Sequence, residues 1–300
     1  MTLVIGATGL LGIEVCRRLS RSGRPVRALV RDTAEAGKRT AIEETGAELV
    51  RGDLKDPASL AAACRGIDEI VTTASSTLSR QAGDSIETVD RRGYLDLIAA
   101  AREAGVSRFV YTSIPPNLRY DSPLSRAKRE VEGALAASGI AYTVIQANYF
   151  MEVWLSPALG FDHASARARV YGRGDQPLAW VSLHDVAEFA VQALDIESTR
   201  NRPVLAGGPD NVPPREVVRT FEEVTGKQFA VEHVPATALE EQRQSAPDPL
   251  SESFAALMLE YAGGVPMDMA DTLAVMPRTL TSVRDYAQTV GGRHERGVSA

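Results

Sequence analysis

The chain has 300 residues, with 33 Lys plus Arg against 39 Asp plus Glu, so its formal net charge is −6. Hydrophobic residues make up 44% and charged residues 24%, which is typical of a globular protein and excludes a disordered, collagen-like or coiled-coil chain. No stretch reaches the roughly 18 apolar residues of a membrane-spanning helix, and the acidic balance argues against a dedicated nucleic-acid-binding protein. We therefore expect neither a membrane nor a nucleic acid as a partner.

The first residues do not resemble a targeting segment. Met1–Ile5 is apolar but has no basic segment, and the Gly-rich run after it is explained better by a turn than by a cleavage site. We expect a cytoplasmic protein. Cys16 and Cys64 fall inside predicted helices without a C-x-x-C pair, so we read both as small core residues. The histidines form no ligand pattern, and no metal site is predicted.

Short β-branched runs alternate with amphipathic stretches over residues 1–146, the pattern of βαβ units around a parallel sheet. The predicted strands are Leu3–Ile5, Val26–Val30, Glu48–Arg51, Glu69–Thr73, Arg108–Thr112 and Tyr142–Gln146. The predicted helices are Leu10–Ser22, Thr33–Thr45, Pro57–Arg65, Ile86–Ala104 and Pro123–Ser138. A glycine follows each helix, where a left-handed residue commonly ends one. This pattern predicts an α/β fold with a doubly wound parallel sheet, the Rossmann fold.

Prolines break the rhythm in the second half of the chain. The helices still predicted there are Leu183–Leu194, Pro214–Thr225, Ser251–Tyr261 and Thr281–Val290. The polar stretch Glu240–Pro249 reads as a linker. We expect residues 1–148 to form the dinucleotide-binding core and 149–290 a smaller C-terminal lobe that closes a substrate cleft. Residues 291–300 read as a disordered tail.

The strongest local motif is Gly6-Ala7-Thr8-Gly9-Leu10-Leu11-Gly12, which follows the first strand and opens the first helix. In that context a G-x-x-G-x-x-G pattern predicts a dinucleotide site, because a helix N-terminus offers free N–H groups and a positive dipole end to a pyrophosphate. Gly6 permits the tight turn, Gly9 the approach of the phosphates and Gly12 close packing of helix on strand. The residues expected to bind the cofactor here are Gly6, Thr8, Gly9, Leu10, Leu11 and Gly12. The alternative is a Gly-rich turn without a ligand.

The end of the second strand indicates which dinucleotide is bound. NAD-binding folds place a carboxylate there for the ribose 2′-hydroxyl, whereas this chain has Arg31. A guanidinium can donate two hydrogen bonds to a 2′-phosphate, so we predict NADP(H). Asp32 is the alternative, because a strand end one residue later would bring a carboxylate to that position. Lys38 either assists or is a solvated helix lysine.

Two further segments are expected beside the cofactor. Asp53 and Leu54 follow the third strand, where Asp53 either accepts from the adenine amine or caps the following turn. Ala74 and Ser75 follow the fourth strand, where small residues let the backbone run close to a ligand.

Several motifs together resemble one family. They are Gly6–Gly12, Leu29–Arg31, Gly52–Leu54, Phe109–Ser113, Asn148–Met151, Val181–Ala187 and Pro277–Leu280. The chain resembles the NmrA-like branch of the atypical short-chain dehydrogenases/reductases over roughly residues 1 to 290. The resemblance implies an NADPH-dependent reductase of quinones, azo compounds or dyes, or a redox-sensing regulator that binds the cofactor without turnover.

The resemblance also implies a catalytic Ser, Tyr and Lys, with Tyr and Lys on one side of a helix in a Tyr-x-x-x-Lys spacing. Ser113 and Lys128 match, but the tyrosine position holds Leu124, which has no proton to give. Tyr120 and Tyr149 are candidate substitutes. We also expect Lys128 to contact the ribose or nicotinamide of the cofactor. The alternatives are a turn contact for Ser113 and a surface ion pair of Lys128 with the carboxylate four residues on.

Asn148, Tyr149 and Phe150 leave the sixth strand at its carboxyl end, where open α/β sheets bind ligands. We expect Asn148 and Phe150 to contact the cofactor and Tyr149 to act in catalysis.

The leading function is an NADPH-dependent oxidoreductase that transfers hydride to a small-molecule acceptor, as a monomer or a homodimer. Without the tyrosine, an electron-poor conjugated acceptor such as a quinone, azo or dye-like compound is favoured, because it delocalises the incoming charge. The alternative is a non-catalytic NADP(H)-sensing regulator that acts through a protein partner. A nucleotide-sugar epimerase is a third reading, weakened by the missing tyrosine and the short C-terminal lobe.

Overall fold

A computed structural model describes residues 1–79 and 81–295, and the chain forms two compact units. The first unit comprises Met1–Ile114, Pro123–Gln146 and Val186–Val204, and the second comprises Pro115–Ser122, Ala147–Asp185 and Leu205–Ala300. The chain thus passes between the units several times, whereas the sequence predicted one boundary after residue 148.

The first unit is built on a seven-stranded sheet with the order β11-β6-β5-β4-β1-β2-β3. Its strands are β1 (Thr2–Ile5), β2 (Val26–Val30), β3 (Glu48–Arg51), β4 (Glu69–Thr72), β5 (Arg108–Ser113), β6 (Ala141–Ala147) and β11 (Arg202–Ala206). In the sheet order β6-β5-β4-β1-β2-β3, each strand pairs in parallel with the next. Leu3 of β1 lies between Arg27 of β2 and Ile70 of β4. The strand order reverses direction beside β1, which is where such folds bind ligands. The predicted doubly wound α/β fold is confirmed.

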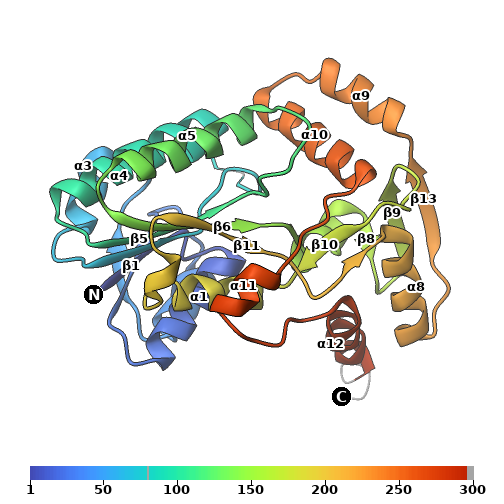
Figure 1. Ribbon diagram of the computed structural model, residues 1–300, viewed down its shortest axis with the longest axis horizontal. Coiled ribbons are helices and arrows are strands. Elements are labelled where there is room, and N and C mark those ends of the chain that lie inside the picture. The colour runs from blue at the N-terminus through green and yellow to red at the C-terminus, as the bar shows by residue number, and fades with distance from the viewer. Residues whose placement is uncertain (80, 296–300) are drawn as a thin grey trace. The chain divides into compact units, whose positions relative to one another are not determined.

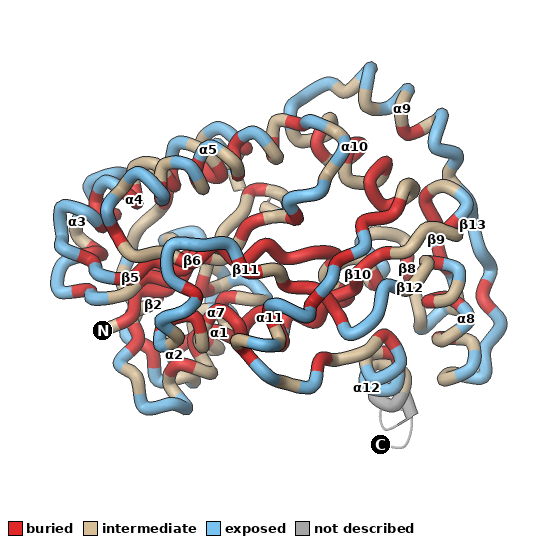
Figure 2. The backbone as a smooth tube through the Cα atoms, in the orientation of Figure 1, coloured by how far each residue is buried: buried red, intermediate tan, exposed pale blue. Residues whose placement is uncertain are grey.

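Helices cover both faces of this sheet, with α3, α4 and α5 on one face and α1 on the other (Figure 1). The helices are α1 (Leu10–Arg21), α2 (Ala36–Glu43), α3 (Pro57–Ala63), α4 (Tyr94–Glu103), α5 (Pro123–Ala137) and α7 (Leu183–Gln192), with a 3-10 turn η3 (Glu197–Thr199). The central strands β1, β4 and β5 are largely buried (Figure 2), because parallel strands inside a sheet are covered on both faces, whereas the edge strand β3 is exposed or half-buried. Cys16 and Cys64 are free and buried within these layers.

The predicted helix Ile86–Ala104 consists of a π-helix followed by an α-helix. Residues Ile86–Gly93 form a π-helix, η1, which continues directly into α4. Ser85 caps its start, since the Ser85 hydroxyl accepts from the Thr88 amide at 3.0 Å. A π-helix is rare and is frequently found at functional sites, because its extra residue redirects the side chains around it. Here it carries Asp90 into the interior, where the residue is fully buried.

The second unit contains two three-stranded sheets, β12-β10-β7 and β13-β9-β8. Its strands are β7 (Tyr149–Phe150), β8 (Phe161–Asp162), β9 (Arg167–Tyr171), β10 (Leu178–Val181), β12 (Asn211–Val212) and β13 (Ala230–Val234). Its helices are α6 (Met151–Trp154), α8 (Pro214–Thr225), α9 (Ala236–Gln244), α10 (Pro249–Gly263), α11 (Ala270–Val275) and α12 (Val283–Glu295), with a 3-10 turn η2 (Pro157–Leu159).

Two sequence predictions for this unit need correction. The predicted linker Glu240–Pro249 is mostly helical, because α9 runs to Gln244 and buries Leu239, while α10 starts at Pro249 after the Asp248 cap. Helix α12 reaches Glu295, so it includes the first part of the expected tail, and residues 296–300 lie outside the described part of the chain.

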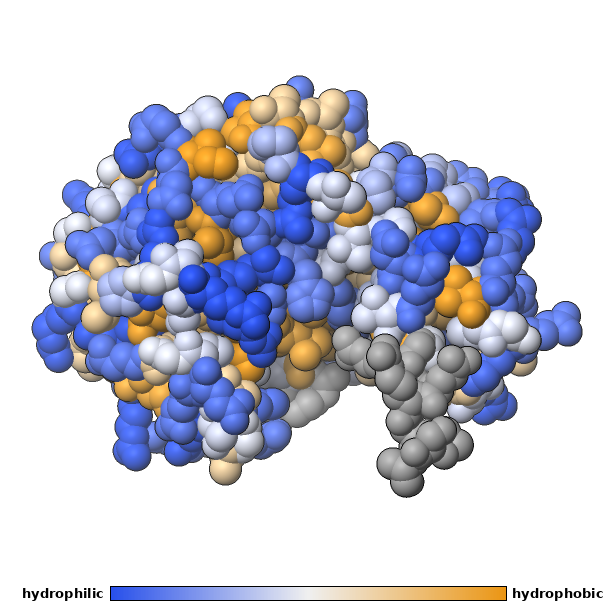
Figure 3. Space-filling view, turned by 90° about the horizontal axis from the view of Figure 1, so that it is seen from below, coloured by the Kyte–Doolittle hydropathy of each residue, from blue (hydrophilic) through white to orange (hydrophobic). Residues whose placement is uncertain are grey.

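Aromatic side chains form much of the core of the second unit. The ring centroids of Tyr149 and Trp154 lie 4.7 Å apart, and Trp154 stacks on Tyr261 at 5.8 Å. Such contacts stabilise a core beyond the area they bury. On the face drawn in Figure 3, apolar surface lies in separate patches among hydrophilic side chains. In the described residues, no helix is long and apolar enough to span a membrane.

Candidate cofactor site

The glycine motif forms a tight turn at the carboxyl end of β1. Gly6 has φ +83°, a conformation that favours glycine, and a Cβ there would come within 2.6 Å of the Ala74 amide nitrogen. A Cβ on Gly12 would come within 2.1 Å of the Gly6 carbonyl oxygen. At Gly9, by contrast, a Cβ would meet that same oxygen alone among the residues that the structure describes, at 3.3 Å, and Gly9 is exposed. The structure therefore requires Gly6 and Gly12 for packing and leaves the space at Gly9 open.

The turn delivers the N-terminus of α1 to this open space. Gly9 is the N-cap residue and, as a glycine, has no side chain that could cap the helix, and the first turn holds no acidic residue. The first N–H groups of a helix have no partner within it, and the dipole makes that end positive. This end of α1 therefore fits an anion such as the pyrophosphate of a dinucleotide. Leu10 is 60% exposed at its opening.

Arg31 is the first residue after β2, so the strand end places Arg31 and not Asp32 beside the turn. Its Nη1 donates to Asp84 Oδ2 at 2.6 Å, and its side chain stays 30% exposed. Asp32 points into solvent, where it pairs with Arg51 at 3.3 Å. The alternative carboxylate is thus removed from this position.

Asp53 and Leu54 have structural contacts. Asp53 Oδ1 accepts from the Lys55 amide at 2.9 Å, which is the turn-capping role that the sequence left open. Leu54 is buried in the core of the first unit. Ala74 runs beside Gly6, and its carbonyl oxygen accepts from the Tyr94 hydroxyl at 2.6 Å. Ser75, half-buried, shares a hydrogen bond of 3.2 Å with the Thr77 hydroxyl.

Lys128 lies inside the first unit, and its partner is not the carboxylate four residues on. Its Nζ lies 3.5 Å from Asp90 Oδ1 of η1 and donates to the Thr112 carbonyl at 3.5 Å. The ammonium also faces the rings of Tyr94 and Tyr111, at 5.4 and 5.0 Å from their centroids. These contacts hold a buried cation in place by charge pairing and by cation–π attraction.

Burial shifts the titration of this group. Desolvation lowers the pKa of Lys128, and the neighbouring Asp90 carboxylate opposes only part of that shift. Asp90 in turn accepts from the Ser76 amide at 2.9 Å and from its hydroxyl at 2.5 Å. Ser76 follows β4 shortly after Ala74 and Ser75, so the buried pair is tied to the strand end next to the glycine turn.

The other members of the expected catalytic set have internal partners. The Ser113 hydroxyl donates to Glu132 Oε1 at 2.5 Å, and Glu132 also pairs with Arg129 at 2.5 Å. Leu124 is buried, with 3% of its surface exposed. A tyrosine at position 124 would need more space than this core provides, and overpacking of that kind costs about 1 to 3 kcal/mol.

Asn148, Tyr149 and Phe150 belong to the second unit. The Asn148 side-chain amide donates to the Val265 carbonyl at 2.8 Å, and its oxygen accepts from the Tyr149 amide at 3.0 Å. The Tyr149 hydroxyl donates to the Leu257 carbonyl at 2.8 Å, and burial raises its pKa well above the usual range. Asn148 and Tyr149 thus use their polar groups for packing within this unit, while Phe150 is partly exposed.

Sequence reasoning missed Lys55, Asp84 and Asp90. The sequence could have indicated a buried ion pair at Asp90, because this residue lies between Ile86 and Tyr94 on the apolar side of a predicted helix, where a carboxylate needs a buried partner. No local sequence pattern indicates the contact of Lys55 with Asp84, since it joins segments far apart in the chain.

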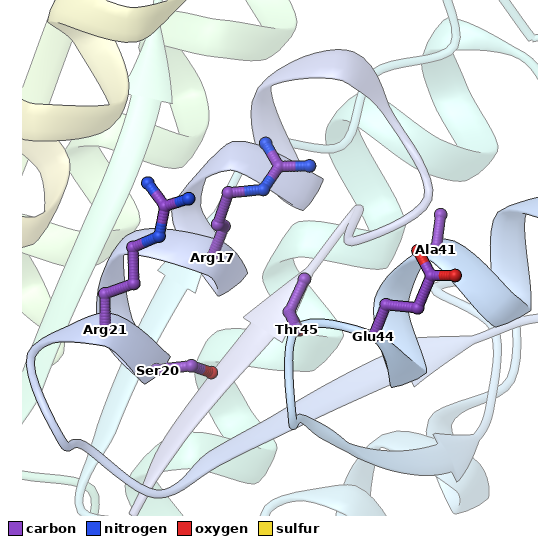
Figure 4. Close-up of a pocket in the computed structure, with 6 residues that line it drawn as sticks. All are labelled: Arg17, Ser20, Arg21, Ala41, Glu44 and Thr45. Atoms are coloured by element: carbon purple, nitrogen blue, oxygen red, sulfur yellow. The ribbon is translucent and has the colours of Figure 1, made fainter.

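A separate pocket lies between α1 and the end of α2, with a volume of about 350 Å³ (Figure 4). Its lining residues are Arg17, Ser20, Arg21, Ala41, Glu44 and Thr45. None of the predicted site residues lines it.

Comparison with known proteins matches the chain to one family. The model of the NmrA-like family matches residues 1–287. An NAD(P)H azoreductase of Xenophilus azovorans is 31% identical over 96% of this chain and 96% of its own length. A photosystem II assembly factor of Synechocystis sp. is 29% identical over 97% of this chain and 90% of its own length.

The fold is also that of a solved reductase. An NADPH-dependent quinone oxidoreductase from Escherichia coli, crystallised with NADPH, superposes with a TM-score of 0.77 at 22% identity, covering 97% of this chain and 99% of its own. The resemblance seen in the sequence motifs is confirmed, and the chain belongs to the NmrA-like family.

Proposed function

We propose that the protein binds NADP(H) at the glycine turn and transfers hydride to an electron-poor conjugated acceptor. The observation that carries this proposal is the uncapped N-terminus of α1 behind the open space at Gly9, with the guanidinium of Arg31 at the end of the adjacent strand. The names of the relatives, an NAD(P)H azoreductase and an NADPH-dependent quinone oxidoreductase, support the same cofactor and the same acceptor class.

The glycine turn and the two neighbouring strand ends would each bind a different part of the cofactor. The amides after Gly9 would hold the pyrophosphate, and Arg31 would donate to the 2′-phosphate. The backbone at Ala74 and Ser75 would border the bound molecule from the β4 side. When bound, the reduced nicotinamide supplies two electrons and one hydrogen as hydride.

The residues around Lys128 indicate the class of acceptor. A positioned general acid contributes about 10² to 10⁴ in rate to a ketone, whose reduction leaves a localised alkoxide. Here Leu124 replaces the tyrosine, and the hydroxyl of Ser113 already donates to Glu132. A quinone spreads the incoming charge over its ring and takes its proton from water to give the hydroquinone. The first unit therefore suits acceptors that need no protein acid.

The same internal contacts favour a second candidate, an NADP(H) sensor. A sensor needs the turn and Arg31 but no proton donor, and the expected catalytic groups Ser113 and Lys128 are committed to Glu132 and Asp90. One relative is named as an assembly factor rather than as a reductase. In this reading the bound cofactor changes the affinity for a protein partner.

A panel of acceptors separates the two candidates. We expect the purified protein to oxidise NADPH with quinones or azo dyes and hardly at all with simple ketones, because only the former need no acid. The loss of NADPH absorbance measures turnover, and calorimetry on the same preparation confirms that the cofactor binds. Tight NADPH binding without oxidation by any acceptor would replace the reductase with the sensor.

Arg31→Asp tests the choice of dinucleotide. We expect the unmodified protein to bind NADPH more tightly than NADH, and the variant to lose about tenfold or more in NADPH affinity, because a charge-assisted pair contributes about 1.5 to 3 kcal/mol. Arg51→Asp is the matched control, since Arg51 is 84% exposed and pairs with Asp32, which is itself 71% exposed. Equal affinities of the unmodified protein for both dinucleotides would refute the NADP(H) assignment.

A further inference from the structure

Asp84 binds two cations at the carboxyl edge of the sheet in the first unit. Its Oδ2 accepts from Arg31 Nη1 at 2.6 Å and from the Ser79 hydroxyl, and its Oδ1 accepts from Lys55 Nζ. The Asp84 side chain is only 2% exposed, whereas those of Arg31 and Lys55 are 30% and 24% exposed. The carboxylate is thus enclosed by donors that themselves reach solvent.

The contacts of Asp84 connect strand ends on the two sides of β1, the strand that bears the glycine turn. Asp84 comes after β4, while Arg31 follows β2 and Lys55 follows β3. In the sheet β1 lies between β4 and β2, so Asp84 contacts cations on the far side of β1 from the strand that it follows. A second contact supports this arrangement, because the Thr33 hydroxyl after β2 donates to the Gln81 side chain.

A carboxylate and a phosphate compete for the same donors. Guanidinium and ammonium groups bind both, and two anions do not share one such site, because they repel each other. Burial by itself raises the pKa of Asp84, but hydrogen bonds from Lys55, Ser79 and Arg31 outweigh it and lower that pKa below its usual value. Asp84 is therefore an anion at neutral pH.

We propose that Asp84 occupies the position of the cofactor's 2′-phosphate, and that Lys55 is the second cation of that phosphate site beside Arg31. The proposal rests on the proposed function, because it concerns the NADP(H) that the turn would hold. When the 2′-phosphate binds, it replaces the Asp84 carboxylate on both cations. An NADPH molecule must displace Asp84 first. The apparent affinity is therefore the intrinsic affinity multiplied by the fraction of molecules in which the site is free.

Two substitutions test the two halves of the proposal by calorimetry. Asp84→Asn removes the competing charge at almost constant size, and we expect about tenfold tighter binding of NADPH and of adenosine 2′,5′-bisphosphate. Lys55→Met removes a donor, and we expect about tenfold weaker binding of both. Binding of NADH and of 5′-AMP, which lack the 2′-phosphate, stays unchanged in both variants.

Glu87→Gln is the matched control for a change of overall charge. Glu87 lies three residues from Asp84 in the chain, is 50% exposed and pairs with Arg91 at 3.0 Å, so its loss should leave NADPH affinity unchanged. Unchanged or weaker NADPH binding in Asp84→Asn overturns the proposal, as does weaker NADH binding, which would mean that Asp84 binds a ribose hydroxyl. Unchanged NADPH binding in Lys55→Met removes Lys55 from the site.

A different result would contradict the proposed function itself. If the unmodified protein and both variants bind no NADPH, the cofactor assignment is wrong and the phosphate site falls with it. If the unmodified protein binds NADPH more tightly than NADH but Asp84→Asn does not change that preference, only the inference about Asp84 is wrong.

Discussion

Gly9→Val is expected to abolish cofactor binding while the protein stays folded. A Cβ at Gly9 would lie 3.3 Å from the Gly6 carbonyl oxygen, and the backbone φ of −83° is one that other residues adopt. The valine side chain would therefore fill the space in front of α1 that the pyrophosphate needs. We expect NADPH affinity to fall by at least about a hundredfold, which corresponds to about 2.8 kcal/mol. Calorimetry measures binding, and thermal unfolding followed by circular dichroism measures the fold.

Gly12→Val is the matched comparison, because it is the same substitution one helical turn away. Its Cβ would lie 2.1 Å from the Gly6 oxygen and 2.8 Å from the Ala7 Cα, both backbone atoms that cannot move aside alone. We expect this variant to unfold or to lose about 3 kcal/mol or more of stability, at the upper end of overpacking. Normal NADPH binding by Gly9→Val would show that the turn is not the phosphate site.

Asp90→Ala is expected to cause a large loss of stability. The substitution leaves the Lys128 ammonium buried without its counter-ion, and breaking a buried pair in this way costs about 3 to 5 kcal/mol. Urea denaturation at neutral pH measures the loss. Lys128→Met combined with Asp90→Asn removes both charges, and this double variant should be far closer in stability to the unmodified protein. Equal losses in the single and double variants would mean that the charge pair is not the cause.

The pH dependence of the single variant follows from the same pKa shift. The pKa of Lys128 is already lowered in the folded state by desolvation, and removal of Asp90 lowers it further. Between the folded and the unfolded pKa the unfolded chain binds more protons, so stability rises with pH. The destabilisation of Asp90→Ala should therefore be complete below the folded pKa of Lys128 and shrink as the pH rises toward the unfolded value. Denaturation series at neutral and alkaline pH measure this trend.

Local patterns predicted strands and helices of the first unit, whereas in the second unit they predicted helices such as α8 but no strands. The strands from β1 to β6 and the glycine turn follow from β-branched runs and from a glycine motif between a strand and a helix, which are short-range signals. The second unit was harder to predict, because its strands are short and Leu239 is the buried residue of a largely polar helix α9. A polar stretch with nearby prolines reads as a linker until a neighbouring core covers its one apolar side.

The sequence by itself determined the fold class, the glycine turn, the arginine after the second strand and the absence of a tyrosine at position 124, because each depends on residues close together in the chain. Only the tertiary structure decided the partners of the charged and polar side chains. Lys128 pairs with Asp90 across 38 positions and Lys55 with Asp84 across 29, while Tyr149 donates to Leu257 across 108. A hydrogen bond or ion pair depends on distances of a few ångströms, and packing of the sheet and its helices sets those distances rather than spacing along the chain.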